Sequence, residues 1–362
     1  MEYDYILVGQ GLAATVLGEH LLRAGQRLLV VEGGAALAAT RVAAGILNPI
    51  TGRNLVKTWL ADEAFAGAMA YYEGLEQRWS LPKGSILLPQ PLHWAIETAR
   101  EWNDWQARQG EAATRNFVQA LHAADERMEA QLRDCIGTAE LALSGRVDFS
   151  ALTAAFRRQL AAGDLWEEMF EYEALQIVDN QQVAYKGVRA RGVIFCEGAR
   201  AQAHNPYFGR LPFWCTKGEV LLVHLPEYEL GERIMKHKGV LLAPMQQAGL
   251  FWLGSTYERD AADLQPTEQA RAYLLEQLQA GWRLGRVEVL EHLSAVRPTV
   301  RDRRPYLGCH PVHRNIFIFN GLGAKGTYLA PYFAPSIAAF VLRGEPLPKE
   351  VNILRLGKKV QW

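Results

Sequence analysis

The sequence predicts an α/β fold in which a nucleotide-binding domain is interrupted by a second domain built on antiparallel strands. Three observations support this prediction: a strand, a glycine turn and a helix near the amino terminus, the same succession near the carboxyl end, and alternating apolar strands between them. The chain has 362 residues, of which 49% are hydrophobic and 22% are charged, so it can bury at least one large core.

The amino-terminal segment has the pattern of a dinucleotide-binding βαβ unit. An apolar strand at 5–8 runs into Gly9-Gln10-Gly11-Leu12-Ala13-Ala14 and a helix, and a second strand at 27–31 ends at Glu32. Small residues let the backbone turn tightly and let a pyrophosphate approach the helix amino terminus. Glu32 stands where an acid can accept hydrogen bonds from the adenosine ribose. The segment therefore predicts a Rossmann-like domain, with a glycine turn in an ordinary α/β protein as the alternative.

The segment that follows Glu32 favours FAD among the nucleotide cofactors. After Gly33 and an alanine-rich connection, residues 40–49 are small, contain glycine and carry few charges. Such a segment can lie against a flat ring, and a flavin enzyme needs backbone donors beside the isoalloxazine. A surface loop of small residues is the alternative interpretation.

A second glycine segment lies near the carboxyl end. The strand at 316–319 is followed by Asn320-Gly321-Leu322-Gly323-Ala324-Lys325-Gly326-Thr327-Tyr328 and by a helix from about 330 to 342. The amides at a helix amino terminus place positive potential at its mouth, which would stabilise an anionic reduced flavin. Residues 295–308, just before this segment, form a polar turn between apolar segments.

Charge and composition limit the partners that we expect. Lys+Arg and Asp+Glu each total 39, so the net charge is zero and long-range attraction to nucleic acid or to an anionic membrane is not indicated. No apolar run approaches the roughly 18 residues of a membrane span. Four scattered cysteines suit a reducing compartment, so we expect a cytoplasmic protein.

We expect no bound metal. The close pair His310 and His313 is interrupted by Pro311, which disfavours a helix that would align the two rings. No third ligand is apparent in the sequence beside this pair, whereas zinc sites use at least three protein ligands.

Taken together, these motifs resemble the D-amino-acid oxidase superfamily of FAD-dependent amine oxidoreductases. The resemblance spans the chain and is specific only as a set. It rests on Gly9-x-Gly11 with Glu32, on 41–46, on 193–199, on Arg297-Pro298 with Asp302 and Pro305, and on 321–326. Within the superfamily, residues 321–331 look most like the tRNA-modifying flavin domain, and residues 297–308 look much like glycine oxidase.

The motifs and the resemblance imply a set of residues that contact FAD. They are Gly9, Gly11, Leu12, Ala13, Glu32, Gly33, Thr40, Arg41, Ala44, Gly45, Ile46, Ala174, Gly198, Leu322, Gly323, Ala324, Lys325, Gly326, Thr327 and Tyr328. Val42 stands where some relatives carry a histidine that is bonded to the flavin, so we expect non-covalent FAD.

The resemblance also implies a group that binds the substrate. Arg297 matches the arginine that holds the substrate carboxylate, and a planar guanidinium suits this task because it donates two parallel hydrogen bonds. No tyrosine lies at 235–241, where glycine oxidase offers a carboxylate-binding one. Tyr257 or Tyr328 can supply that hydroxyl, and a buried tyrosine bonded to a backbone carbonyl is the alternative for either.

We expect the two domains to be discontinuous. The FAD-binding domain is predicted to comprise residues 1–80, 145–205 and 291–345. An α+β substrate domain on an antiparallel sheet is predicted from residues 81–144 and 206–290, and residues 346–362 form a carboxyl-terminal tail.

The expected activity is oxidation of the C–N bond of an amino acid or related amine carboxylate, by hydride transfer to flavin N5. Two alternatives stay open: a flavin enzyme that acts on an aminomethyl-modified tRNA uridine, and a flavin-binding module without catalysis. The sequence does not indicate which amine is oxidised, which acceptor reoxidises the flavin, or how many subunits assemble.

Overall fold

The structure, a computed structural model, describes residues 2–33, 38–52, 54–228, 231–259 and 263–360. It divides into two compact units. Unit 1 comprises Met1–Ala43, Phe149–Thr216 and Val296–Trp362, and unit 2 comprises Ala44–Asp148 and Lys217–Ala295. Residues 44–80, which the sequence assigned to the FAD-binding domain, fall in unit 2, and the segment 206–216 falls in unit 1. Residues 361 and 362 of the predicted tail lie outside the described part.

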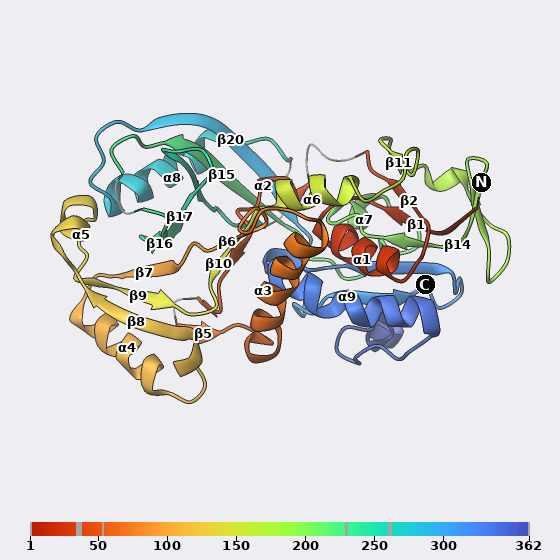
Figure 1. The fold of residues 1–362 in the computed structure, drawn as a ribbon, viewed down its shortest axis with the longest axis horizontal. Coiled ribbons are helices and arrows are strands. Elements are labelled where there is room, and N and C mark those ends of the chain that lie inside the picture. The colour runs from red at the N-terminus through yellow and green to blue at the C-terminus, as the bar shows by residue number, and fades with distance from the viewer. Residues whose placement is uncertain (1, 34–37, 53, 229–230, 260–262, 361–362) are drawn as a thin grey trace. The chain divides into compact units, whose positions relative to one another are not determined.

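Unit 1 is built on an eight-stranded sheet whose central strands are parallel (Figure 1). β2 and β14 flank β1 in parallel, and the end of β14 pairs in parallel with β22. These strands are buried along nearly their whole length, as expected of a parallel sheet covered on both faces. The strands are β1 (Glu2–Val8), β2 (Leu28–Val31), β11 (Leu165–Trp166), β12 (Leu175–Ile177), β13 (Val183–Tyr185), β14 (Val188–Phe195), β21 (Tyr306–Cys309) and β22 (Ile316–Asn320).

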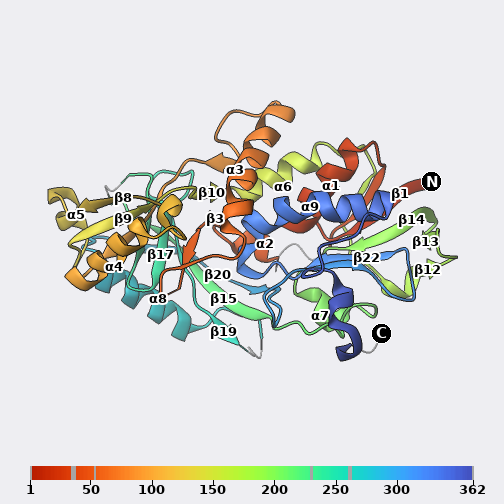
Figure 2. The same ribbon diagram turned by 90° about the horizontal axis from the view of Figure 1, so that it is seen from below.

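Three helices of unit 1 lie side by side across one face of this sheet, as Figure 2 shows. α1 packs against both α9 and α6. Gly18 of α1 makes a close approach possible, because a Cβ there would lie 2.5 Å from the ring of Phe156 in α6. The helices of unit 1 are α1 (Leu12–Arg23), α2 (Ala39–Val42), α6 (Phe149–Arg157), α7 (Arg200–His204) and α9 (Gly326–Arg343), with 3₁₀ turns η3 (Tyr172–Ala174), η4 (Gly323–Lys325) and η5 (Ile353–Lys359).

Unit 2 is built on a nine-stranded sheet. The sequence predicts antiparallel pairing, and the structure has one parallel pair in this sheet, β16 with β7, among the pairs that it describes. The strands are β7 (Leu92–Ile96), β8 (Val118–Ala123), β9 (Gly137–Leu141), β15 (Thr216–His224), β16 (Ile234–His237), β17 (Val240–Pro244), β18 (Leu250–Gly254), β19 (Glu258–Arg259) and β20 (Glu288–Arg297).

Helices cover both faces of this larger sheet. On one face Trp94 of β7 meets Trp105 of α4, with ring centroids 5.4 Å apart. On the other face Met235 packs with Leu274 of α8 in one buried cluster. The remaining elements of unit 2 are α3 (Ala61–Arg78), α4 (Ala99–Gly110), α5 (Glu126–Gln131), α8 (Glu268–Gly281), η2 (Arg115–Phe117), and the short strands β3 (Ile46–Leu47), β4 (Ile50–Thr51), β5 (Val56–Lys57), β6 (Leu87–Leu88) and β10 (Gly145–Val147).

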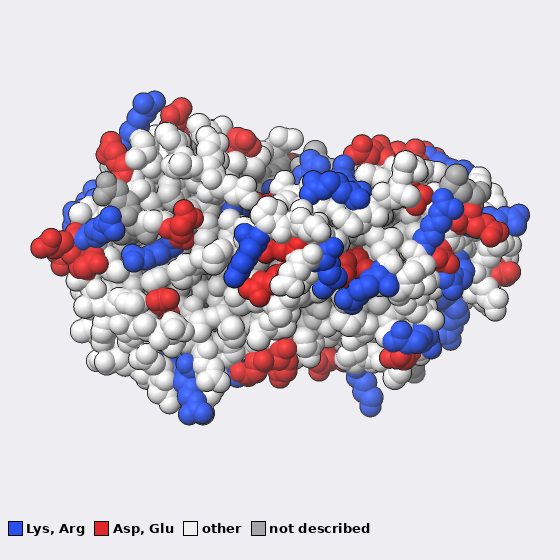
Figure 3. Space-filling model, viewed as in Figure 1, with Lys and Arg blue, Asp and Glu red and all other residues white. Residues whose placement is uncertain are grey.

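Across the described residues, no helix combines the length and the apolar character needed to span a membrane. On the face drawn in Figure 3, basic and acidic side chains lie interspersed. This distribution agrees with the zero net charge of the chain.

Candidate active site

Four segments that the sequence analysis assigned to a cofactor emerge at one edge of the unit 1 sheet. Because β1, β2, β14 and β22 are parallel, their carboxyl ends meet at the same edge. The residues that follow these ends are Gly9 after β1, Glu32 after β2, Gly198 after β14 and the glycine segment 321–326 after β22. Ligands of open α/β sheets bind at such an edge.

The first of these segments needs glycine for steric reasons. Gly9 has a φ of 94°, and a Cβ there would lie 2.8 Å from the Cys196 carbonyl oxygen. A Cβ on Gly11 would lie 3.0 Å from Thr40 Oγ1, which accepts a hydrogen bond of 3.0 Å from the Leu12 amide. The first turn of α1 leaves further amides without intrahelical acceptors, so this helix end is suited to an anion.

Glu32 lies at the end of β2 and accepts a hydrogen bond from the Gln10 amide. The acid therefore stabilises the glycine turn, in addition to any bond to a ribose. The next residue, Gly33, also has a steric role, because a Cβ there would lie 2.2 Å from the Met169 nitrogen. The sequence did not predict either contact.

The carboxyl-terminal glycine segment contacts two other parts of the candidate site. A Cβ on Gly326, the first residue of α9, would lie 3.0 Å from Leu12 Cδ2, so the amino termini of α1 and α9 are close together. The Gly323 amide donates a hydrogen bond of 3.1 Å to the Pro298 carbonyl. Gly326 is thus adjacent to the amino-terminal turn, and Gly323 is adjacent to the Arg297-Pro298 segment.

Basic side chains accompany this segment. Arg297 is the last residue of β20 and is half-buried. Lys325 is also half-buried, and no acidic partner is found for it among the described residues. Burial, followed by repulsion from Arg303 and Arg304, lowers the pKa of Lys325. A half-buried ammonium at this position favours the binding of an anion.

A polar network that the sequence analysis missed supports the end of β14. The Glu197 carboxylate accepts hydrogen bonds from the Tyr172 hydroxyl and from Asn205 Nδ2, and burial raises its pKa. The following Gly198 has a φ of 59°, and its carbonyl accepts a bond of 2.9 Å from Asn320 Nδ2 at the end of β22. Ala174 closes the same 3₁₀ turn as Tyr172. The sequence offered one signal for this network, which is that the polar Glu197 comes just after an apolar strand.

Some predicted site residues belong to unit 2 instead. These are Ala44, Gly45, Ile46 and Tyr257. A Cβ on Gly45 would lie 2.0 Å from the Val147 oxygen, and the Gly45 carbonyl accepts from the Val147 amide at 2.9 Å. Strand pairing within unit 2 therefore already requires this glycine. Tyr257 is 56% exposed, with the Arg259 guanidinium 5.9 Å from its ring centroid.

The other predicted residues of unit 1 differ in exposure. Arg41 and Ala324 are exposed, whereas Ala13, Leu322, Thr327 and Tyr328 are buried. Tyr328, which is 3% exposed, lies in the first turn of α9.

The sheet edge of unit 1 fits a dinucleotide. Two helix amino termini supply amide donors, and Gly9 and Gly11 allow close backbone approach. At Gly198, the position that a Cβ would take has no described atom within 4 Å other than those of Gly198 and its two chain neighbours. The edge therefore combines anion-binding groups with space.

Comparison with known proteins gives the class of this protein. Residues 4–339 match the model of a family described as FAD dependent oxidoreductase. The chain therefore belongs to the FAD-dependent oxidoreductase family, and the resemblance to the D-amino-acid oxidase superfamily is confirmed. Among its relatives, glycine oxidase from Geobacillus kaustophilus is 25% identical over 363 residues, which cover 95% of this chain and 94% of that protein.

A second relative matches a shorter stretch. The tRNA 5-methylaminomethyl-2-thiouridine biosynthesis bifunctional protein from Paracidovorax citrulli is 33% identical over 123 residues, which cover 30% of this chain and 19% of that protein. Among solved structures, glycine oxidase from Bacillus cereus has a TM-score of 0.78 at 18% identity, covering 95% of this chain and 96% of that chain. Iminodiacetate oxidase from Chelativorans sp. BNC1 has a TM-score of 0.76 at 21% identity, covering 96% and 98%. These structures confirm the predicted fold class.

Proposed function

We propose that this protein oxidises the C–N bond of a small amine that carries a carboxylate, with non-covalently bound FAD. The observation that carries the proposal is the meeting of three distant segments in unit 1. Gly326 lies against Leu12, and Gly323 donates to the Pro298 carbonyl next to Arg297. The candidate cofactor turn, the second helix terminus and the candidate carboxylate-binding residue are therefore structurally linked.

The cofactor would be held mainly by the backbone. The amides at the starts of α1 and α9 suit the pyrophosphate and the electron-rich ring, and Glu32 suits the ribose. Val42 is a buried valine, which cannot form a bond to the flavin. We therefore expect acid precipitation to release all of the flavin into the supernatant, and yellow colour retained in the washed pellet would contradict non-covalent binding.

Arg297 would bind the substrate carboxylate through two parallel hydrogen bonds and thereby orient the α-carbon. Lys325, Arg303 and Arg304 would contribute positive potential that stabilises negative charge as it develops. Bound FAD supplies the hydride acceptor. Desolvation lowers the pKa of an amine, so the substrate nitrogen can be neutral before oxidation without a dedicated side-chain base.

The proposed function is tested by an anaerobic screen. Purified holoprotein is mixed with amino acids, imino acids and simple amines, and loss of visible flavin absorbance is followed by stopped flow. We expect bleaching by one or more amine carboxylates and not by matched amines without a carboxylate. Absence of bleaching by every compound would favour the non-catalytic flavin-binding alternative.

The role of Arg297 is tested by two substitutions. Arg297→Ala should reduce kcat/KM for flavin reduction at least thirtyfold, because a contact of this type contributes about 2 to 5 kcal/mol. Arg297→Lys is the matched variant, since it keeps the charge but loses the planar fork, and it should retain an intermediate rate. An Arg297→Ala protein with unchanged kcat/KM would remove Arg297 from the site.

An aminomethyl-modified tRNA uridine is the second candidate substrate. The observation that favours it is the 33% identity over 123 residues with the bifunctional tRNA-modifying protein. The net charge of zero opposes unaided RNA binding. Filter binding of total tRNA at low salt discriminates between the candidates, because only the second predicts retention that decreases as salt rises.

A further inference from the structure

A separate polar cluster lies in unit 2, on the sheet face from which Met235 contacts α8. It contains His93 of β7, His122 of β8 and Glu140 of β9. The register places His93 opposite both Met235 and Glu140. Because side chains alternate between the faces of a sheet, His93 and Glu140 point to the same side. His122 lies opposite Thr138, two residues before Glu140, and so shares this face.

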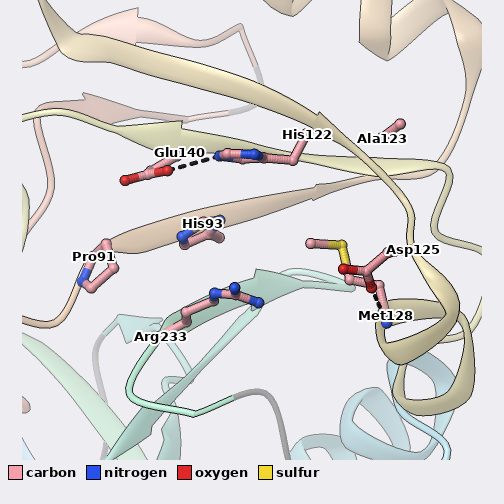
Figure 4. A pocket seen from close by; sticks show the side chains of 8 residues that line it. All are labelled: Pro91, His93, His122, Ala123, Asp125, Met128, Glu140 and Arg233. Carbon is pink, nitrogen blue, oxygen red and sulfur yellow. Dashed lines mark hydrogen bonds and ion pairs between the residues drawn. The ribbon is translucent and has the colours of Figure 1, made fainter.

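The donor atoms of the three side chains are close together. One ligand atom from each residue can be chosen so that all lie within 4.8 Å of one another. His122 Nε2 and Glu140 Oε2 are 2.8 Å apart, and the two imidazole ring centroids are 5.8 Å apart at 33°. Figure 4 shows these side chains on neighbouring strands, with Arg233 on the other side of His93 from Glu140.

His93 has the features of a preorganised ligand. It is 3% exposed, and its Nδ1 lies 3.3 Å from Thr138 Oγ1. With Nδ1–H donating to that oxygen, Nε2 carries a lone pair, which is the arrangement found when a second residue orients a metal-bound histidine. Burial lowers the pKa of His93 to about 4; the nearby Glu140 opposes this shift, and Arg233 and His122 add to it.

The cluster lines an open cavity of about 460 Å³. This volume accommodates an ion together with bound water or a small anion. The cavity walls also include Asp125, but its Oδ1 accepts from the Met128 amide at 2.8 Å and caps α5. The donor set that remains is two imidazoles and one carboxylate, which is a common set for zinc with an open coordination position.

We propose that His93, His122 and Glu140 bind a divalent transition-metal ion of the zinc type. Bonds of about 2.0 to 2.2 Å place ligand atoms about 3.5 Å apart in a tetrahedral site. The widest of the present separations, which is at most 4.8 Å, must therefore shorten, whereas the 2.8 Å between His122 Nε2 and Glu140 Oε2 must lengthen. The His122 and Glu140 side chains, 42% and 26% exposed, can rotate to achieve this, whereas His93 is fixed.

The positive charge of Arg233 and the two imidazoles together limit which cations the site accepts. A guanidinium beside the site repels any cation, and binding must therefore come from strong imidazole coordination. Mg²⁺ and Ca²⁺ prefer oxygen ligands and gain little from imidazole, so they should be excluded. The inference is independent of the proposed oxidation, because no predicted FAD or substrate residue belongs to the cluster.

The test uses chelator-treated holoprotein that retains its flavin absorbance. Isothermal titration with ZnCl₂ should give one site, with an affinity weakened at least a hundredfold in His122→Ala and in Glu140→Gln. The matched control is His224→Ala, since His224 forms a similar histidine–carboxylate pair with Glu288 at 3.9 Å in the same unit, and among the described residues no third ligand joins that pair. Titration with MgCl₂ should show no binding.

Several results would overturn the inference. Equal zinc affinity in wild type and His122→Ala would do so. An X-ray absorption spectrum at the zinc edge that lacks two imidazoles and one carboxylate in the coordination shell would also do so. Phosphate binding that depends on Arg233, without zinc binding, would instead identify an anion pocket. His122 and Glu140 are chosen because they are partly exposed, and circular dichroism confirms that each variant is folded.

Discussion

Unit 1 and unit 2 both bring residues from distant parts of the chain together. Unit 1 does so at the ends of its strands, and unit 2 does so through the register of adjacent strands. In unit 1, parallel strands end at one edge, and the groups gathered there are glycine turns and helix amides. In unit 2, adjacent strands in register place the side chains of His93, His122 and Glu140 on one face. Backbone groups spread along an edge suit a large ligand, whereas convergent side chains suit an ion.

The comparison also shows that two glycines with similar backbone geometry are required for different reasons. Gly9 and Gly45 both have positive φ, and a Cβ on either would clash with a carbonyl oxygen. Gly9 meets the end of β14 at the candidate cofactor edge, whereas Gly45 meets Val147 of β10 within unit 2. A glycine in a small-residue segment is therefore not by itself evidence of approach to a cofactor.

The largest expected effect comes from exchanging these two glycines for alanine. Gly45→Ala should lower the free energy of unfolding by about 3 kcal/mol or more, because its Cβ would lie 2.0 Å from the Val147 oxygen at a φ of 72°. Gly9→Ala should abolish flavin binding, measured as the ratio of flavin to protein absorbance. The comparison fails if Gly45→Ala is as stable as wild type or if Gly9→Ala retains full flavin content.

A smaller effect is expected from Lys236 in unit 2, whose ammonium lies 3.5 Å from the Trp94 ring centroid. Burial lowers its pKa from 10.5 to about 8. Between these pH values the unfolded chain binds more protons, so this group makes stability rise as pH increases. Lys236→Met should be more stable at pH 7 by about 1 to 3 kcal/mol, with the difference gone above pH 10.5.

Denaturant unfolding at several pH values measures this difference. Lys83→Met, which replaces an exposed lysine of the same unit, is the control for removing a surface ammonium. A Lys236→Met curve parallel to that of wild type would show that the lysine retains an ordinary pKa.

Unit 1 contains a buried group whose response to pH has the same sign but falls in a lower pH range. His310 Nδ1 accepts hydrogen bonds from the Val312 and His313 amides, and burial lowers its pKa from 6.5 to about 4. Its contribution to stability is complete above pH 6.5 and is lost as pH falls towards 4. His310→Asn should remove about 1 to 2 kcal/mol of this acid sensitivity, as followed by thermal unfolding from pH 7 to 4. An equally acid-sensitive variant would contradict the prediction.

The smallest expected effect concerns the contact between the amino termini of α1 and α9. Gly326→Ala should weaken flavin binding about tenfold in reconstitution of the apoprotein, because its Cβ would lie 3.0 Å from the flexible end of Leu12. The double variant Leu12→Ala with Gly326→Ala should recover most of this loss. Additive losses in the double variant would place the effect of Gly326 elsewhere.

The sequence predicted the segments of unit 1 well because their signals are local. A strand, a glycine turn and a helix are contiguous in the chain, and Glu32 follows its own strand directly. The bond from Gln10 to Glu32 and the network of Tyr172 and Asn205 around Glu197 could not be predicted, because they depend on how separate segments pack.

The two histidine pairs give the same lesson. The sequence drew attention to His310 and His313 because they are close in the chain, yet His310 is used to bind backbone amides. His93 and His122 lie on separate strands, and only the register of the sheet brings them together. Local spacing carries no information about such a pair.

The contact between Leu12 and Gly326 has a consequence for biosynthesis. The first helix of the chain cannot meet its neighbour until the ribosome has delivered residue 326, and β14 cannot gain its partner β22 until residue 316 has emerged. Unit 2 is translated in two portions during this wait. A cofactor that needs both helix termini is therefore acquired only after residue 326 has left the ribosome, and a nascent chain arrested before that point should remain colourless.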